Sequence, residues 1–297
     1  MGRGTGQRHR AGRDPGRQGC GFPGPGPVSR VSTFADLFQA RQQNGCWTFE
    51  LEARFNGAFG GTNGGVAAAV SLHAARGDRR ELVPAAIDCH FLKGCRPGTA
   101  TVTTRPLSEG RTLTVIATET RDHTGSLCTA DLVTLVNPDR LEQALRALPA
   151  ICVPADRSAE PLPWRQPTGH RIPLIDTFAP EIVASSGDST TTRIRPGFDV
   201  RDATAEAVCI AADISVGPPV GRAVSGRASL PNPNLALRFS GARYAGSHLQ
   251  SCCRLAQIEA GLACTEIRVG SDEMLLGTGT SMTTCLPLPG SRGRGSG

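Results

Sequence analysis

The sequence lacks long apolar runs and Cys-x-x-Cys motifs, and it has few aromatic residues. No apolar stretch in its 297 residues approaches the roughly 18 to 20 residues that a membrane-spanning helix needs, so a transmembrane chain is excluded. Without a Cys-x-x-Cys pair, neither a zinc ribbon nor a thioredoxin-type redox site is supported. A single Tyr and two Trp provide no stacking platform for single-stranded nucleic acid.

A net positive charge is also missing from the body of the chain. The formal net charge is +6, but residues 1–30 hold six arginines against one aspartate, and residues 291–297 add two arginines. The intervening body, 31–290, is close to neutral and has no basic face. We therefore expect no nucleic-acid partner.

Further signatures of particular enzyme classes are absent. No Gly-x-Ser-x-Gly elbow occurs, so an α/β-type serine hydrolase has no support. The glycine-rich run 56–65 is not followed by the Lys-Ser/Thr pair that completes a phosphate loop. The His and acidic residues show no metal-ligand spacing. We expect no nucleotide hydrolysis, no metal and no other cofactor.

The eleven cysteines are an odd number in a fairly long chain. The N-terminal stretch is rich in Arg and Gly and has no apolar core, which argues against a secretory signal. We therefore expect a cytoplasmic protein in which most cysteines are reduced thiols that fill space as small apolar residues.

The order of patterns predicts two similar units between two disordered tails. Residues 1–30 and 291–297 are the predicted tails, because Gly-, Pro- and Arg-rich stretches without hydrophobic periodicity bury too little surface to become ordered. The first unit, 31–148, has a strand-like segment at 47–55, the glycine-rich turn, a nearly all-apolar helix and then four strand-like segments, at 83–92, 99–106, 111–121 and 127–136.

A Pro-containing linker, 149–165, is predicted to precede a second unit, 166–290, in which the pattern recurs. An apolar helix over 203–214 is followed by strand-like segments at 234–240, 247–258, 261–269 and 273–284. One hairpin repeats in residue identity at an offset of 147, since Thr118-Glu119-Thr120-Arg121 corresponds to Thr265-Glu266-Ile267-Arg268. Each unit therefore has the order expected when a curved antiparallel sheet wraps a central helix.

Short motifs in both units resemble a known family. The first unit contains Phe59-Gly-Gly61 before the apolar helix, His90-Phe91-Leu92, and Glu109-Gly110-Arg111-Thr112. The second contains Ala211-Ala-Asp213, Pro233-Asn-Leu-Ala-Leu237 and the final hairpin ending at 277–282. Over roughly 31–288 these motifs resemble the acyl-CoA thioesterase II-like proteins of the thioesterase-like superfamily.

The resemblance implies an α+β double hotdog fold, with an acyl thioester lying between the two central helices. In this family hydrolysis is attributed to an Asp, a Thr or Ser, and a Gln that orient a water molecule. The Asp matches Asp213, whereas the hydroxyl position falls on Asn234 and the Gln position on Ser281. Asp213 is then expected to activate water, with Asn234 and Ser281 as its polar partners. Only one of the three family residues is retained.

Other polar residues are candidates for contact with substrate. Gly60, Gly61, Thr62 and Asn63 stand where the first apolar helix begins, and backbone N–H groups there can bind a carbonyl oxygen. The alternative is that Thr62 or Asn63 only caps the helix. His73 on that helix and His90 in the following strand are either groove-lining residues or structural ones.

These features predict an acyl thioester hydrolase that acts on acyl-CoA or on an acyl group bound to a carrier protein. The altered positions at Asn234 and Ser281 keep two alternatives open. One is a non-hydrolytic hotdog enzyme of polyketide-type specialised metabolism, a dehydratase, isomerase or cyclase. The other is a non-catalytic acyl-binding module. Joined hotdog units commonly associate further, so a homo-oligomer is one expected state of the protein.

Overall fold

The computed structural model describes residues 1–2, 33–79, 81–141, 162–163, 172–225, 227–271 and 274–288. The chain divides into two units, Met1–Arg30 and Val31–Gly297, and the fold described below belongs to the second. The predicted tails 1–30 and 291–297 and the predicted linker 149–165 lie almost wholly outside the described residues. The boundaries predicted for the two repeated hotdog units, 31–148 and 166–290, stay predictions.

The first half of the fold follows the predicted order closely. The glycine-rich turn leads into helix α2 (Gly64–Arg76), whose buried residues are mostly alanine and valine. The strands are β1 (Arg41–Gln43), β2 (Cys46–Leu51), β3 (Val83–Phe91), β4 (Gly98–Glu109), β5 (Leu113–Arg121) and β6 (Leu127–Val136), with short helical turns at α1 (Phe34–Leu37), Ala53–Phe55 and Pro138–Arg140. The strand predicted over 47–55 ends at Leu51, because a 3₁₀ turn takes up its last residues.

The second half repeats this arrangement around helix α4 (Thr204–Ala223). Its other elements are β7 (Leu162–Pro163), α3 (Leu174–Phe178), β8 (Glu181–Ser186), β9 (Ser189–Ile194), β10 (Ala228–Ser229), β11 (Asn234–Phe239), β12 (Leu249–Glu259), β13 (Leu262–Gly270), β14 (Leu275–Thr284) and β15 (Leu286–Pro287). The helix predicted to end at residue 214 is wrong at its end, because the described helix continues through Pro218 and Pro219 to Ala223.

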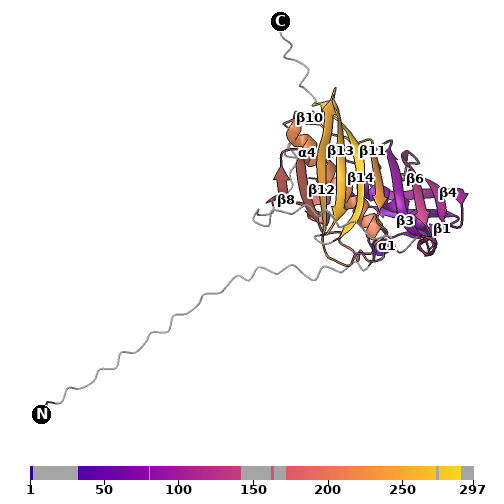
Figure 1. Cartoon of the computed structure of the whole chain (residues 1–297), viewed down its shortest axis with the longest axis horizontal. Coiled ribbons are helices and arrows are strands. Elements are labelled where there is room, and N and C mark those ends of the chain that lie inside the picture. The colour runs from indigo at the N-terminus through magenta and orange to yellow at the C-terminus, as the bar shows by residue number, and fades with distance from the viewer. Residues whose placement is uncertain are drawn as a thin grey trace, which may run out of the picture. The chain divides into compact units, whose positions relative to one another are not determined.

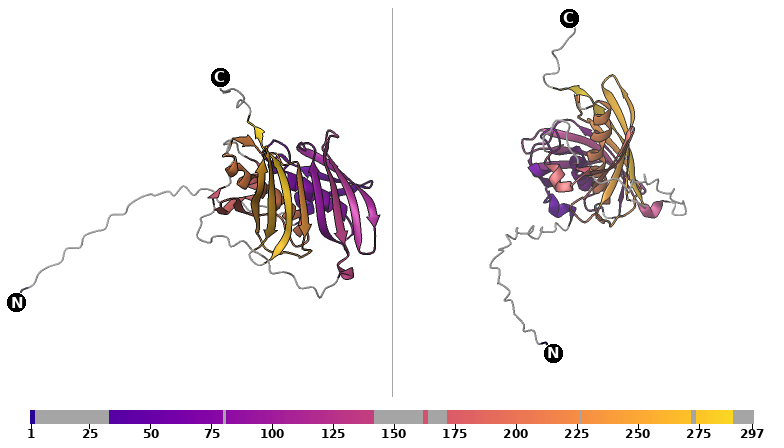
Figure 2. Two further views of the ribbon diagram at one scale, coloured as in Figure 1. Left: turned by 45° about the horizontal axis from the view of Figure 1, so that its top comes forward. Right: turned by 90° about the vertical axis from the view of Figure 1, so that its left-hand side faces the viewer.

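The two halves share one antiparallel sheet. Among the described residues it has 13 strands in the order β1-β2-β4-β5-β6-β3-β11-β14-β13-β12-β9-β8-β7. Figure 1 shows β3 of the first half beside β11 of the second, and Figure 2 shows the sheet from two further sides. Strands β3 and β11 join the halves, with Asn234 opposite His90 and Arg238 opposite Ala86. A separate two-stranded sheet pairs β10 with β15. The predicted α+β hotdog fold is confirmed.

The two central helices pack antiparallel and very closely. A Cβ atom added at Gly65 of α2 would lie 2.5 Å from the carbonyl oxygen of Cys209 in α4 and 2.8 Å from Cβ of Asp213. At the opposite end of α2, Arg76 Nη1 donates to the carbonyl oxygen of Asp202, 2.8 Å away, just before α4 begins. The start of α2 therefore lies against the middle of α4, and the end of α2 lies against the start of α4.

Apolar side chains of the described residues fill the space between sheet and helices. The largest fully buried ones include Phe38, Phe49, Phe55, Phe178 and Leu72. The cysteines in the described ranges are free, and each of them is buried or partly buried. No helix that the structure describes combines the length and apolarity needed to cross a membrane. A cytoplasmic location stays a prediction.

Candidate active site between the central helices

A cavity of about 810 Å³ lies where the start of α2 meets the middle of α4. Most of its lining residues come from four segments, namely the turn and helix start at 57–64, the loop at 91–95, the part of α4 from 213 to 222 and the loop at 228–233. Much of the lining is apolar, including Leu174, Ile182, Ile214, Val216, Leu230 and Leu288. Its charged lining among the described residues is Asp213, Lys93 and Arg222.

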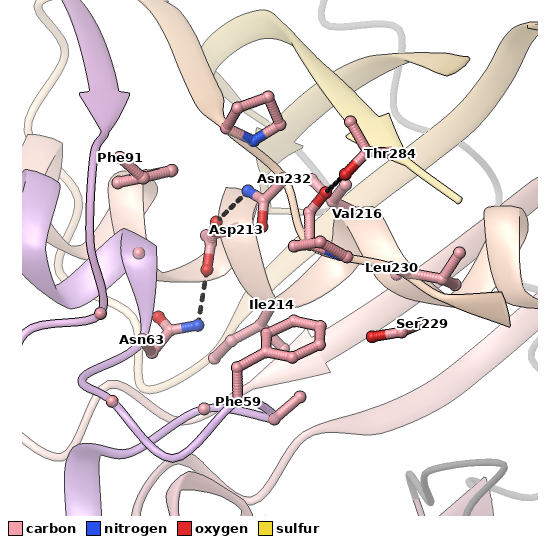
Figure 3. A pocket seen from close by; sticks show the side chains of 18 of the residues that line it. Phe59, Asn63, Phe91, Asp213, Ile214, Val216, Ser229, Leu230, Asn232 and Thr284 are labelled. Carbon is pink, nitrogen blue, oxygen red and sulfur yellow. Dashed lines mark hydrogen bonds between the residues drawn. The ribbon is translucent and has the colours of Figure 1, made fainter. Parts of the chain in front are cut away.

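The carboxylate of Asp213 is held by two amide side chains, one from each half of the fold (Figure 3). Asn63 Nδ2 donates to Oδ2 at 2.5 Å, although the two residues are 150 positions apart in the sequence. Asn232 Nδ2 donates to Oδ1 at 2.7 Å. Asp213 itself is only 9% exposed, so the orientation of the carboxylate is closely defined.

Asn63 has its amide orientation fixed by its place in the helix. It is the N-cap of α2, and its Oδ1 accepts a hydrogen bond from the backbone N–H of Val66 at 3.3 Å. Since the oxygen of the amide faces Val66, its nitrogen faces Asp213. The same side chain therefore caps α2 and contacts Asp213, and a role of Asn63 in binding substrate stays a prediction.

Asn232 is positioned by the loop between β10 and β11. Pro231 and Pro233 flank it, and each proline restricts its own φ angle. The carbonyl oxygen of Pro231 accepts from Thr284 N at 2.9 Å, and that of Pro233 accepts from Phe91 N at 2.9 Å. Asn232 is therefore held between the end of β14 and the end of β3.

Burial raises the pKa of Asp213 above its ordinary value, because the charged form loses water contact. Hydrogen bonds from Asn232, the Gly65 and Gly64 backbone N–H groups, and Asn63 oppose this shift without cancelling it. The start of α2 also carries partial positive charge that favours a nearby anion. The result is a carboxylate that stays anchored yet has a raised affinity for a proton.

The two amides retain hydrogen-bonding capacity toward the cavity. Each Asn nitrogen carries two N–H groups, and one of them goes to Asp213. The second N–H of each amide, and the Oδ1 of Asn232, can bind a water molecule or a carbonyl oxygen beside the carboxylate. This arrangement suits general-base chemistry on a molecule in the cavity.

Of the predicted residues, the structure brings Gly61, Thr62, Asn63 and Asp213 together in the cavity lining. Gly60 belongs to the same turn but does not line the cavity; its φ of 79° is one that glycine adopts readily.

Asn234 and Ser281 do not contact Asp213 and do not line the cavity. Asn234 Oδ1 accepts from Met282 N at 2.9 Å, and Ser281 Oγ donates to the Asn234 carbonyl oxygen at 2.7 Å, so both residues join β11 to β14. The contacts expected of them are made instead by Asn63 and Asn232. Sequence reasoning missed Asn232, although an amide between two prolines in the same motif was a usable signal.

His73 and His90 also lie outside the cavity lining. His73 is near the far end of α2, stacked on Phe34 with ring centroids 4.9 Å apart, and its Nδ1 is 3.4 Å from Glu206 Oε1. Burial acts to raise the pKa of Glu206, but the charge of Arg76 and the hydrogen bond from His73 outweigh it and hold that pKa below its usual value. His90 is exposed on β3.

No three His, Cys, Asp or Glu side chains gather as metal ligands in the ranges that the structure describes.

Comparison with known protein families matches part of the first half of the chain to a family model. Residues 53–136 match the family model described as the acyl-CoA thioesterase N-terminal domain. No curated protein matches the chain. The resemblance to acyl-CoA thioesterase II-like proteins predicted from the sequence is confirmed.

Solved structures share the fold over most of the chain. A hotdog-fold protein of unknown function from Alicyclobacillus acidocaldarius is 17% identical, with a TM-score of 0.67 over 86% of this chain and 98% of that one. The tesB protein of Mycobacterium avium subspecies paratuberculosis is 15% identical, with a TM-score of 0.65 over 84% and 97%. An acyl-CoA thioesterase II, TesB2, from Mycobacterium marinum is 12% identical, with a TM-score of 0.63 over 86% and 99%. At these identities the structures show the fold alone.

Proposed function

We propose that this acyl-CoA thioesterase II-like hotdog protein hydrolyses acyl thioesters, with Asp213 as the group that activates water. One observation carries the proposal: a buried carboxylate, held by one amide from each half of the fold, lines a largely apolar cavity. The match of residues 53–136 to an acyl-CoA thioesterase domain supports the same chemistry.

In the proposed reaction, Asp213 accepts a proton from a water molecule while the water oxygen attacks the thioester carbon. The negative charge that develops on the carbonyl oxygen is stabilised by N–H donors at the cavity wall, for which the second N–H groups of Asn63 and Asn232 are suited. When the tetrahedral species collapses, the C–S bond breaks and the thiolate takes the proton from Asp213. The products are a carboxylic acid and a free thiol, and no covalent enzyme intermediate is needed.

The charges of the cavity favour substrates that carry a phosphate. Lys93 and Arg222 are its cationic lining residues among those described, and both are exposed. Acyl-CoA and acyl carrier proteins share a phosphopantetheine arm, so either can place an anionic phosphate near one of these cations. The apolar part of the cavity would hold the acyl chain. We expect the reaction to take place in the cytoplasm.

The test is release of free thiol from acyl-CoA thioesters of increasing chain length, and from acyl carrier proteins. Wild-type protein should release thiol, and Asp213→Asn should lower kcat/KM on the order of 10²- to 10⁴-fold, as expected for loss of a general base. Circular dichroism of the variant checks its folding. Folded wild-type protein that releases no thiol from any of these substrates would contradict the proposal.

The lyase, isomerase and cyclase alternatives, with their polyketide context, receive no support from the family model or the structures compared above. A non-catalytic binding module predicts acyl-CoA binding without thiol release, which the same assay detects.

A further inference from the structure

Helix α4 contains two prolines in its interior, five and six residues after Asp213. Pro218 and Pro219 lie within Thr204–Ala223. Proline has no backbone N–H, so the carbonyl oxygens of Ile214 and Ser215, four residues earlier, lack the donors that an α-helix normally provides. A carbonyl group left without its donor is an acceptor for another molecule.

The two freed carbonyl groups face different surroundings. Ile214 and Pro218 both line the cavity, so the gap between them lies on the cavity side of the helix. Ser215 is fully buried, and its hydroxyl lies 2.7 Å from Ser251 Oγ on β12. Pro219 is buried and does not line the cavity. Of the two residues that lose their helical donor, only Ile214 is among those that line the cavity.

The same face of α4 continues to a fixed cation. Arg222 follows Pro218 by four residues, which places both on one side of a helix. Arg222 Nη2 donates to the carbonyl oxygens of Gly187 at 3.2 Å and Ser189 at 2.6 Å, which holds the guanidinium in place. From Asp213 to Arg222 this part of the helix therefore carries, in order, a carboxylate, a backbone carbonyl group without its i+4 donor, and a positive charge.

We propose that the carbonyl oxygen of Ile214 accepts a hydrogen bond from the first amide N–H of a pantetheine arm, with the arm running along α4 toward Arg222. This inference rests on the proposed thioester hydrolysis and names the part of the substrate that the cavity recognises. In such a thioester only two methylene groups separate the sulfur from that amide nitrogen. An unsubstituted acyl chain offers no donor, so the pantetheine side supplies the partner for Ile214.

The test restores the backbone N–H group that Pro218 lacks. Pro218→Ala returns an N–H to position 218, which can occupy the Ile214 carbonyl oxygen within the helix. The probes are S-octyl-N-acetylcysteamine, a thioether that cannot be hydrolysed, and the same compound with its amide nitrogen methylated. Wild-type protein should bind the N–H compound about three- to tenfold more tightly than the N-methyl compound, the range expected for one neutral hydrogen bond.

Pro218→Ala should abolish that preference by weakening binding of the N–H compound alone. Pro219→Ala is the matched control, because it also returns an N–H to the helix but on the face toward β12, and it should keep the preference. Isothermal titration calorimetry measures both. The inference is overturned if wild-type protein binds the two compounds equally or binds neither, or if Pro218→Ala keeps the preference.

The outcome is separate from that of the proposed function, because binding is measured without any reaction. If the protein prefers the N–H compound but releases no thiol, the proposed hydrolysis is contradicted and the proposed subsite is supported. If it releases thiol but shows no such preference, the subsite is contradicted and the hydrolysis is supported.

Discussion

Asn232 and Asn234 form a matched pair of residues, two positions apart and of the same chemical type. Asn232 donates to Asp213, whereas Asn234 bonds to the backbone of β14. Because a hydrogen bond to a charged group is worth about 1.5–3 kcal/mol, Asn232→Ala should lower kcat/KM roughly 10- to 150-fold. Asn234→Ala should leave kcat/KM within a few-fold of wild type in the same thiol-release assay. Equal losses in the two variants would contradict a role that Asn232 has and Asn234 lacks.

Asp131 is a second buried carboxylate, beneath the cavity wall. Its Oδ2 accepts from Thr118 Oγ1 at 3.1 Å and from Thr129 Oγ1 at 2.9 Å, and Thr129 lines the cavity. Burial raises the pKa of Asp131 above its ordinary value. A raised folded-state pKa stabilises the fold fully below the unfolded value of about 3.9, and that stabilisation is lost as pH rises through the folded value.

Asp131→Asn removes this titration while keeping an oxygen that can accept from the threonines. The melting temperature of the variant minus that of wild type should therefore increase as pH is raised from about 4 to 7, the range that begins at the unfolded pKa. Other titrating groups are common to both proteins and cancel in the difference. A difference that stays constant or falls over this range would show that the charge of Asp131 does not destabilise the folded state.

The sequence identified individual residues of the cavity only where they lie in or beside a recognisable motif. Asp213 and the turn residues Gly61, Thr62 and Asn63 were predicted and do line the cavity. Asn232 was missed because its role depends on a loop that two other strands hold in place, which no local pattern reports. The same limit explains why Asn234 and Ser281, correctly placed on strands, were expected to face a carboxylate that they do not reach.

At the scale of elements, the contact between α2 and α4 depends on the absence of a side chain at Gly65. An added Cβ would meet the carbonyl oxygen of Cys209 at 2.5 Å, a backbone atom that cannot turn aside. Gly65→Ala should destabilise the protein by about 1–3 kcal/mol, as expected for overpacking. Urea denaturation measures the change.

Gly221→Ala in α4 is the control for that substitution. Its Cβ would lie in ordinary contact, 3.6 Å from Leu230 Cδ1, so the higher helix propensity of alanine should stabilise the protein by up to about 1 kcal/mol. If Gly65→Ala were as stable as Gly221→Ala, the close approach of the helices would not be a packing constraint.

Strands and helices differed in how well local rules predicted them. Strands β3 to β6 follow the alternation of polar and apolar residues, and their predicted ranges agree with the structure to within a few residues. The end of α4 was predicted too early because Gly217-Pro218-Pro219 normally stops a helix. Pro219 and Val220 are buried against the rest of the molecule, and local sequence rules do not include the stabilisation that such tertiary contacts give to a helix.

At the scale of the whole molecule, the halves share both their sheet and their core. Strand β3 pairs with β11, and α2 packs on α4. Neither half can lose its structure without exposing the buried surface of the other, so we expect one cooperative unfolding transition. Differential scanning calorimetry should give a calorimetric enthalpy equal to the van't Hoff enthalpy. Two resolved transitions would show that the halves unfold independently.

The antiparallel helix pair has two ends that resemble each other in position and differ in chemistry. At one end Asn63 faces Asp213, and at the other His73 faces Glu206. Two identical single-unit chains related by a twofold axis would carry the same residues at both ends. In a single polypeptide that contains both units, the symmetry is not imposed, because each substitution changes one end of the helix pair only. Evolution can therefore alter one end of this helix pair while the other keeps its carboxylate and amides unchanged.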